Sequence, residues 1–205
     1  MLLDASTSQL VLMDYQPGVL KVLFESDAVQ SNALRLARAA QLFALPILGT
    51  EHAPQSLGTT PHVLRSCYQK TLAKMHFSAV QGGLSAYLRA TAQMAPGNAR
   101  SLPKHLQKSL TTAPMRDNIV LAGCEAHICL MQTALQLLED DFNVWVVTDA
   151  SSSISERNRD AAYDRLASAG AELVSTEMVL FEWLGSAEHP LFAQVLDLVK
   201  SPDPR

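Results

Sequence analysis

The chain has 205 residues, of which 48% are hydrophobic, and 16 Lys and Arg against 20 Asp and Glu give it a formal charge of -4. This length suits one α/β domain, so we expect a single domain over residues 1–205, and the charge argues against an anionic membrane or nucleic acid as a general partner. No apolar run approaches the ~20 residues that span a bilayer. Three cysteines and an N-terminus without a basic leader predict the cytoplasm, with mitochondrial association left open.

Strand-like apolar runs alternate with helical patterns along the chain, which is typical of a parallel sheet with helices on both faces. We therefore predict an α/β fold, a Rossmann-like three-layer α/β/α arrangement around a six-stranded parallel sheet. In chain order we expect a strand from Ser8 to Asp14, a helix over 26–44, strands at 46–50 and near 69–73, a helix over 85–91, a strand at 118–123, a helix over 130–139, a strand at 143–149, a helix over 157–169, a strand at 172–175, and helices over 178–184 and 191–200.

The first strand ends in a lone acid, Asp14. Ligands of open α/β sheets bind beyond the carboxyl ends of the strands, so Asp14 is a candidate site residue, although an acid in this place is more often a turn or cap residue. Gln16 lies two residues further on and either orients a substrate or binds its own loop. Lys74 precedes Phe77-Ser78, where its flexible cationic side chain either reaches a charged site or is solvated.

The segment Ile119–Cys129 reads as a buried strand that ends at Gly123, turns sharply and delivers a cysteine to a helix start. Backbone N–H groups at a helix N-terminus lower the pKa of a thiol and bind anions. Cys129 is therefore a candidate nucleophile with a lowered pKa, and we expect it to be the most reactive thiol of the chain. The alternative is a buried cysteine that acts as a small apolar side chain.

At Asp14, Lys74 and Cys129 the sequence resembles the isochorismatase-like hydrolase superfamily, whose members carry an aspartate after the first strand, a lysine before a Phe-Ser or similar pair, and a cysteine at the strand-to-helix turn. The resemblance extends over nearly the whole chain and is strongest to the branch of isochorismatase domain-containing proteins. It also rests on the stretches 50–58, 123–129, 149–153 and 189–192. It implies a cis peptide bond between Cys124 and Glu125.

The resemblance implies a catalytic triad. Asp14 takes the proton of the thiol, Lys74 supplies positive charge, and Cys129 attacks a carbonyl carbon. The backbone N–H groups of Glu125 and Cys129 hold the oxyanion, and a thioester is then hydrolysed. Isochorismatases proper act on a vinyl ether and typically lack the cysteine, so Cys129 favours an amidase that cleaves a C–N bond of a small amide-like substrate. An Asp14→Asn variant is then expected to keep its fold and lose turnover.

We predict no metal and no cofactor. The nicotinamidase branch carries an acid and histidines after the second strand, whereas here Glu51-His52 is followed by no Asp-x-His group, and the other histidines lack zinc-ligand spacing. Glu51 remains a pocket candidate. Phe77 lines the pocket or belongs to the core, and His127 lines the pocket or packs at the turn. Cys124 is expected to be structural, and Cys67 has no visible role.

Residues 93–117 lose periodicity and look like an insertion relative to the family, which is typical of a lid, an interface or an exposed loop. This segment is basic, with Arg100, Lys104, Lys108 and Arg116. A solvated loop is one interpretation. The other is a second hypothesis for function, a catalytically idle protein that binds partners or RNA through residues 100–116.

The C-terminal helices carry more apolar side chains than one face of a sheet needs, and family members are commonly oligomers. We therefore expect a homo-oligomer that acts on a small molecule. The side chains that suggest it are Leu180, Trp183, Leu184, Phe192, Leu196 and Val199.

Overall fold

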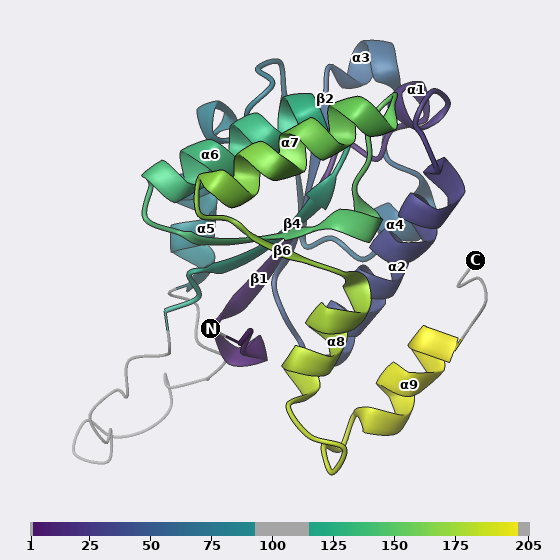
Figure 1. Ribbon diagram of the computed structural model, residues 1–205, viewed down its shortest axis with the longest axis vertical. Helices are drawn as coiled ribbons and strands as arrows, with labels where there is room; N and C mark the ends of the chain where they lie inside the picture. Colours follow the sequence, from purple (N-terminus) through teal and green to yellow (C-terminus); the bar gives the residue numbers. More distant parts are fainter. Residues whose placement is uncertain (1, 93–114, 201–205) are drawn as a thin grey trace, which may run out of the picture.

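The computed structural model describes residues 2–92 and 115–200, and it contains a six-stranded parallel sheet in the order β3-β2-β1-β4-β5-β6 (Figure 1). The strands are β1 (Ser8–Met13), β2 (Ile47–His52), β3 (Lys70–Lys74), β4 (Asn118–Gly123), β5 (Asn143–Val147) and β6 (Glu172–Val174). The predicted α/β fold with a six-stranded parallel sheet is confirmed.

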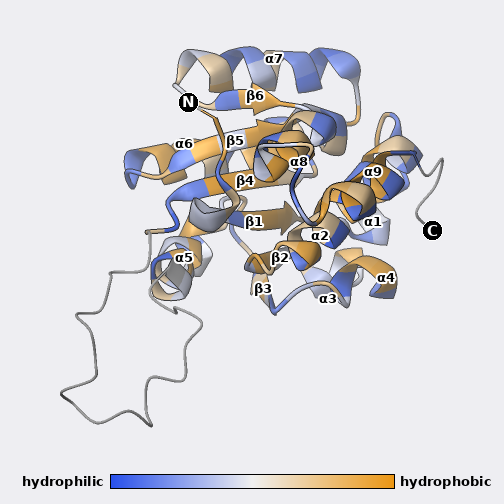
Figure 2. Ribbon diagram, turned by 90° about the horizontal axis from the view of Figure 1, so that it is seen from below, coloured by the Kyte–Doolittle hydropathy of each residue, from blue (hydrophilic) through white to orange (hydrophobic). Residues whose placement is uncertain are grey.

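Helices cover both faces of this sheet. The α-helices are α1 (Pro17–Leu20), α2 (Ser26–Leu42), α3 (Pro54–Leu57), α4 (His62–Arg65), α5 (Leu84–Ala92), α6 (Met131–Glu139), α7 (Glu156–Ser168), α8 (Thr176–Leu184) and α9 (Phe192–Lys200). Figure 2 shows α5 and α6 on one side of the strands and α2, α8 and α9 on the other. None of the helices that the structure describes is long and apolar enough to cross a membrane.

The core consists of two hydrophobic clusters, one on each face of the sheet. Leu10 and Leu12 of β1 belong to the cluster beneath α2 and α8, while Val11 and Met13 belong to the cluster beneath α5 and α6. All six residues of β1 are buried, because a central parallel strand has helices on both sides.

The strand order places a topological switch point between β1 and β4. The chain runs outward from β1 through β2 to β3 and then returns to the other side of β1 as β4. Connections that leave two neighbouring strands in opposite directions open a crevice at the carboxyl ends of those strands. Asp14 follows β1 and Cys124 follows β4, so the fold brings both candidate segments to this crevice.

Several predicted boundaries shift by a few residues. The helix expected over 26–44 ends at Leu42, because Ala44 adopts a left-handed conformation (φ 54°) two residues before Pro46. The fifth strand ends at Val147, since Thr148–Ala150 form a 3-10 turn.

The predicted insertion at 93–117 lies outside the described residues except for its last three. Arg116 is half-buried, and its Nη1 donates hydrogen bonds to the carbonyl oxygens of Ala5 (3.1 Å) and Ser8 (2.8 Å). Arg116 therefore holds the start of β1, and its guanidinium is not the free surface cation that an RNA contact requires.

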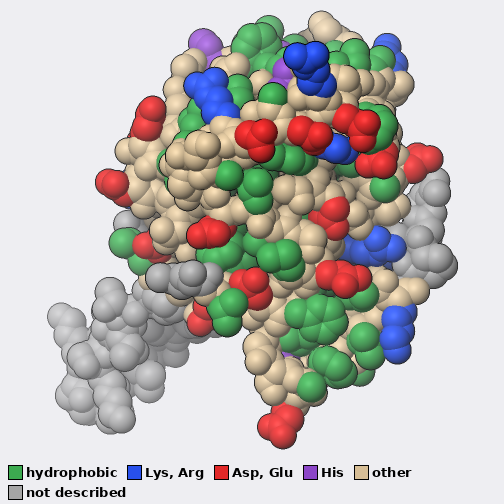
Figure 3. Space-filling view, viewed as in Figure 1, with side chains coloured by type: hydrophobic (Ala, Val, Ile, Leu, Met, Phe, Trp, Pro, Cys, Tyr) green, Lys and Arg blue, Asp and Glu red, His purple; other side chains and the backbone are tan. Residues whose placement is uncertain are grey.

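Five of the six apolar side chains that suggested an oligomer lie in or against the core of this chain, and the sixth, Leu196, is half-buried. Leu180, Trp183 and Leu184 are buried in the cluster beneath α2, and Phe192 and Val199 pack against that cluster. The exposed apolar side chains of α8 are instead Met178 (47% exposed) and Phe181 (40% exposed). In Figure 3 hydrophobic side chains gather over the region of α8 and α9.

Gly123 ends β4 at a point where no side chain fits. A Cβ atom at this position would lie 2.5 Å from both Cβ and the carbonyl oxygen of Met13. The same carbonyl oxygen accepts a hydrogen bond of 3.0 Å from the N–H of Cys124. Glycine therefore lets β4 run against the end of β1 and enter the turn that follows.

We expect Gly123→Ala to lower the free energy of unfolding by about 3 kcal/mol, because the added methyl group must displace the β1 backbone. Gly170→Ala is the matched control, since its φ of 99° is also unfavourable for alanine but a Cβ there meets no atom within 4 Å. Urea denaturation measures both. Equal losses for the two variants would contradict the close approach as the reason for glycine.

Candidate active site

Asp14 lies at the carboxyl end of β1 and is 1% exposed. Its backbone has a left-handed conformation (φ 56°), which interrupts the strand alternation. The carboxylate accepts hydrogen bonds from Thr50 Oγ1 (2.7 Å) and from Lys74 Nζ (2.7 Å), one on each oxygen. Asp14 is thus a buried carboxylate held by β2 and β3; its backbone lies in a turn, but its side chain caps no helix, since the N-cap of α1 is Gln16.

Lys74 is the last residue of β3, and its side chain is 0% exposed in the ion pair with Asp14. The ammonium also donates to the carbonyl oxygens of Phe77 (3.0 Å) and His76 (3.5 Å). A side-chain hydrogen bond with Lys74 also acts on the thiol of Cys129, so the ammonium lies among several buried polar groups. The solvated alternative for Lys74 is wrong.

Cys129 lies on the turn that follows β4 and is 6% exposed. The peptide bond between Cys124 and Glu125 is cis, as the resemblance implies. The helical conformation begins at Ala126, earlier than predicted, in a π-helical turn over Ala126–Leu130 that leads into α6. The N–H of Leu130 bonds to the carbonyl oxygen of Glu125 (3.3 Å), which places Cys129 inside the first turn. Among the described residues, no acceptor contacts the N–H of Glu125.

The loop between β5 and α7 holds this turn at three successive residues. Ser151 Oγ accepts from the N–H of Gly123 (3.1 Å), and the carbonyl oxygen of Ser152 accepts from the N–H of Ala126 (2.7 Å). Ser153 Oγ lies 2.9 Å from Nδ1 of His127. The serine run 151–153 thus fixes the backbone around Cys129, a role that its sequence alone does not reveal.

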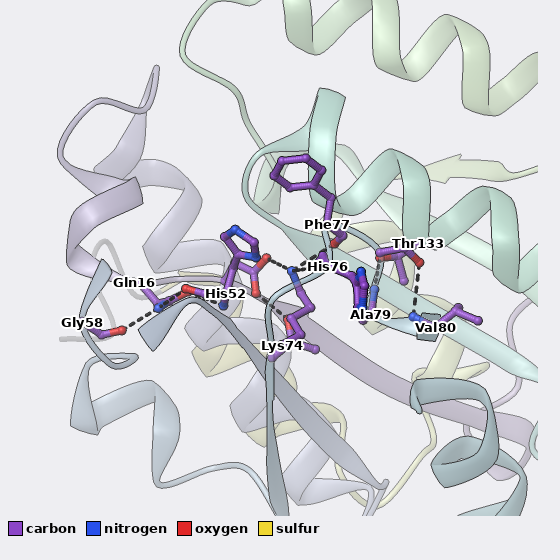
Figure 4. Close-up of polar contacts among 12 residues, drawn as sticks. Gln16, His52, Gly58, Lys74, His76, Phe77, Ala79, Val80 and Thr133 are labelled. Atoms are coloured by element: carbon purple, nitrogen blue, oxygen red, sulfur yellow. Dashed lines mark hydrogen bonds and ion pairs between the residues drawn. The ribbon is translucent and has the colours of Figure 1, made fainter. Parts of the chain in front are cut away.

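The loop after Lys74 is fastened to α6, the helix that continues from Cys129. The N–H of Ala79 donates to Thr133 Oγ1 (3.0 Å), as Figure 4 shows. Ser78 Oγ also donates to Gln136 Oε1. These contacts bring the catalytic candidates of β3 and of the turn after β4 into one arrangement.

The pKa of the Cys129 thiol is raised to about 12, first by burial and next by the negative charge of Asp14. Lys74 lowers the pKa but does not compensate, because its charge is already balanced by Asp14. The predicted lowered pKa of Cys129 is therefore wrong. The opposing influences of Asp14 and Lys74 on the same thiol also show that all three side chains share one site.

Two of the pocket candidates, Gln16 and Glu51, form hydrogen bonds to the backbone of neighbouring segments. Gln16 is fully buried, and its amide donates to the carbonyl oxygens of His52 (3.0 Å) and Gly58 while accepting from the N–H of His52 (2.8 Å). Glu51 accepts from the N–H of Thr60 (2.8 Å). Because side chains alternate along a strand, Glu51 faces away from Thr50 and the ion pair. Neither side chain is available to orient a substrate.

The other two candidates lie near the site. The Phe77 ring is 50% exposed, so its assignment to the core is wrong. His127 is held through Ser153 and lies 3.4 Å from Asn158 Nδ2, so it packs the turn.

Thr50 and His52 are site residues that the sequence interpretation missed. Both lie on the face of β2 opposite Glu51, and His52 is the cross-strand partner of Lys74. The alternation along β2 could have identified them only if the register against β1 and β3 had been known. No cluster of three or more His, Cys, Asp or Glu suited to a metal occurs in residues 2–92 and 115–200.

Comparisons with known proteins identify the family and the fold. The sequence pattern described as Isochorismatase domain matches residues 102–178. Isochorismatase domain-containing protein 2 of Bos taurus is 33% identical over 97% of this chain and 85% of its own length, and the Xenopus laevis protein is 32% identical over 98% and 88%. The chain belongs to the isochorismatase family.

Solved structures of similar proteins cover the chain almost completely. A MAR1 ribonuclease from Caenorhabditis elegans superposes with a TM-score of 0.82 at 26% identity, covering 100% of this chain and 95% of its own. YcaC from Pseudomonas aeruginosa, solved with hexane-2,5-diol and covalent acrylamide, gives 0.76 at 25% identity, with 96% and 91% covered. YcaC from Escherichia coli, an octameric hydrolase of unknown specificity, shares the fold with a TM-score of 0.80 at 24% identity over 97% and 90% of the two chains.

Breaking the buried ion pair should cost about 3–5 kcal/mol of unfolding free energy, because the remaining charge stays buried without its partner. We expect Lys74→Met to show this loss, and Asp14→Asn to destabilise the fold as well, contrary to the expectation from sequence. The double variant should lose less than the sum of the two single losses. Urea denaturation of the three variants measures the coupling, and strictly additive losses would contradict it.

The raised pKa predicts how Cys129 reacts with iodoacetamide. Only the thiolate reacts, so the rate should rise about tenfold for each pH unit between about pH 7 and 10. Asp14→Asn removes a negative charge, lowers the pKa and should speed labelling at pH 8, whereas Lys74→Met should slow it. Peptide mapping separates Cys129 from Cys67 and Cys124. A rate that levels off below about pH 9 would contradict the raised pKa.

Proposed function

We propose that this protein is a cysteine-dependent hydrolase that cleaves the C–N bond of a small amide-like substrate through a thioester. One observation carries the proposal: the buried Asp14 carboxylate, fixed by Lys74 at 2.7 Å, acts electrostatically on the thiol of Cys129. A nucleophile, a base within its reach and a cation that orients the base are the parts that covalent amide hydrolysis requires.

In the first step, Cys129 Sγ attacks the carbonyl carbon of the substrate and its proton passes to the Asp14 carboxylate. A thiol with a pKa of about 12 is neutral at rest, so bond formation and proton transfer proceed together. The negative charge moves to the carbonyl oxygen. We assign the N–H groups of Glu125 and Cys129 as the donors to this oxyanion. The N–H of Glu125 has no acceptor among the described residues, which supports the assignment.

In the second step, the tetrahedral intermediate collapses and the C–N bond breaks. Asp14 returns its proton to the departing nitrogen, which leaves as ammonia or an amine. Water then adds to the thioester and gives a proton to Asp14, and the C–S bond breaks. The thiolate recovers the proton from Asp14, which releases a carboxylic acid and restores the site.

Lys74 holds Asp14 in position through both steps and balances its charge. Because the ammonium is paired with the Asp14 carboxylate at 2.7 Å, its role in this proposal is to orient the base. Pseudomonas aeruginosa YcaC was solved with covalent acrylamide, which reacts with nucleophiles through its C=C bond, so that related protein carries a reactive nucleophile.

Similarity to the Caenorhabditis elegans MAR1 ribonuclease favours a second candidate, an RNA-associated role. Most of the basic residues that would serve it, Arg100, Lys104 and Lys108, lie outside the described residues, and Arg116 is engaged by β1. We place this alternative second because Arg116, the described member of this set, is held by the start of β1.

We also propose a homo-oligomer. The support is the octameric Escherichia coli YcaC and the exposed apolar side chains Met178 and Phe181 on α8.

A screen of primary carboxamides in the presence of hydroxylamine tests the hydrolase. A thioester on Cys129 is trapped as a hydroxamate, and ammonia is released in both the trapped and the untrapped reaction. Cys129→Ala should abolish both products, and Asp14→Asn should lower turnover by roughly a hundredfold or more. Cys67→Ala is the matched control, because Cys67 is also a buried thiol but lies before β3.

Ammonia release that survives Cys129→Ala would overturn the thioester mechanism. Cleavage of a fluorescent single-stranded RNA that is equal in the wild type and in Cys129→Ala would instead support the RNA-associated candidate.

A further inference from the structure

We propose that His127 is a positioning residue that orients the backbone N–H of Glu125 toward the oxyanion of the reaction. It is held for this purpose by Ser153, in the loop after β5, and by Asn158 of α7. The inference rests on the proposed function, and it adds a residue that the reaction requires outside the proposed catalytic triad.

The His127 side chain is fixed on two sides. Its Nδ1 lies 2.9 Å from Ser153 Oγ, and the same oxygen accepts from the backbone N–H of His127 (3.3 Å). Its Nε2 lies 3.4 Å from Asn158 Nδ2. Ser153 is fully buried, so its hydroxyl is a fixed anchor for the turn. The ring cannot rotate without breaking contacts at both of its nitrogens.

These partners determine which ring nitrogen carries the proton. The amide nitrogen of Asn158 only donates, so Nε2 of His127 accepts and Nδ1 bears the hydrogen. Nδ1–H then donates to Ser153 Oγ, which receives two donors from one residue. His127 is thus bound through both its backbone and its ring to a single buried hydroxyl.

The carboxylate of Glu125 belongs to the same set of contacts. Its Oε2 lies 3.7 Å from Nδ1 of His127 and accepts from the N–H of Ile154 (3.3 Å). A carboxylate that turned toward the oxyanion would repel it, because both are negative. The contacts with His127 and Ile154 keep this charge beside the loop after β5, while the N–H of the same residue serves the reaction.

The backbone on either side of Glu125 is held by other contacts. The N–H of Cys124 donates to the carbonyl oxygen of Met13 (3.0 Å), and the N–H of Ala126 donates to that of Ser152 (2.7 Å). Between them, the N–H of Glu125 has no acceptor among the described residues. An oxyanion donor is effective only when it already points to the place where charge develops. His127 supplies the side-chain contacts that complete this orientation.

Propionaldehyde tests the role of His127 without a known substrate. Cys129 Sγ bonds to its carbonyl carbon, the thiol proton passes to Asp14, and the C=O bond opens to an oxyanion that the two N–H groups bind. Iodoacetamide alkylates the same thiol by displacing iodide and forms no oxyanion. Protection of Cys129 by propionaldehyde therefore measures the oxyanion donors, whereas the rate with iodoacetamide alone measures the thiol.

We expect His127→Leu to weaken the affinity for propionaldehyde about tenfold, the size of one hydrogen bond to a charged group. The rate with iodoacetamide alone should not change. His127→Asn carries an amide N–H close to the position of Nδ1 and should restore most of the affinity. Peptide mapping of Cys129 over a series of aldehyde concentrations measures all variants.

A second variant tests the contact from the other side. Ser153→Ala should weaken protection as His127→Leu does, and the double variant should lose no more than the larger single loss, because both changes remove the same contact. His62→Leu, which replaces an exposed histidine of α4, is the control and should leave protection unchanged.

Equal protection in the parent protein and in His127→Leu overturns the positioning role and leaves the hydrolase intact. The role is also overturned by an equal loss in the rate with iodoacetamide, or by a loss that His127→Asn does not restore. If propionaldehyde fails to protect Cys129 in the parent protein, both the inference and the oxyanion site fail. If protection depends on His127 but the parent protein hydrolyses no carboxamide, the positioning role stands and the proposed hydrolase fails.

Discussion

The buried ion pair between Asp14 and Lys74 organises the catalytic end of this fold. It joins the ends of β1 and β3 across β2, whose Thr50 supplies the other hydrogen bond to the carboxylate. Removing two charges from water is costly, and pairs of well-packed apolar residues are often at least as stable. Such a pair at the switch point of the sheet is explained better by chemistry than by stability. Its hydrogen bonds leave Asp14 one defined orientation, toward the neighbouring thiol.

The turn that carries Cys129 is held by a second set of contacts. Gly123 allows β4 to approach β1, and the serine run 151–153 holds the turn from the side of β5. The thiol that results is buried and neutral at rest. A neutral thiol reacts slowly with electrophiles in solution. The arrangement therefore suits a nucleophile that is activated only when a bound substrate allows proton transfer to Asp14.

The edge of the site is formed by two aromatic rings, those of His52 and Phe77. The rings of His52 and Phe77 extend from the ends of β2 and β3, while the groups that carry the proposed reaction lie below them. Both rings are attached to the same hydrogen-bond network through Gln16 and Lys74. The contacts of Gln16 and Lys74 thus connect residues that lie far apart in the chain at one edge of the sheet.

The sequence by itself determined the alternation of strands and helices, and with it the parallel sheet, because hydrophobic periodicity reflects burial directly. The residue types at the strand ends, Asp14, Lys74 and Cys129, were also identifiable there. Only the tertiary structure determined the hydrogen-bond partners of Asp14 and Lys74 and the pKa of Cys129. Burial and the charge of Asp14 raise the pKa of Cys129. The two residues are 115 positions apart in the sequence, and only the fold brings their side chains together. Likewise, the roles of Thr50 and His52 depend on the register of β2 against its neighbours, and side-chain alternation within one strand does not fix that register.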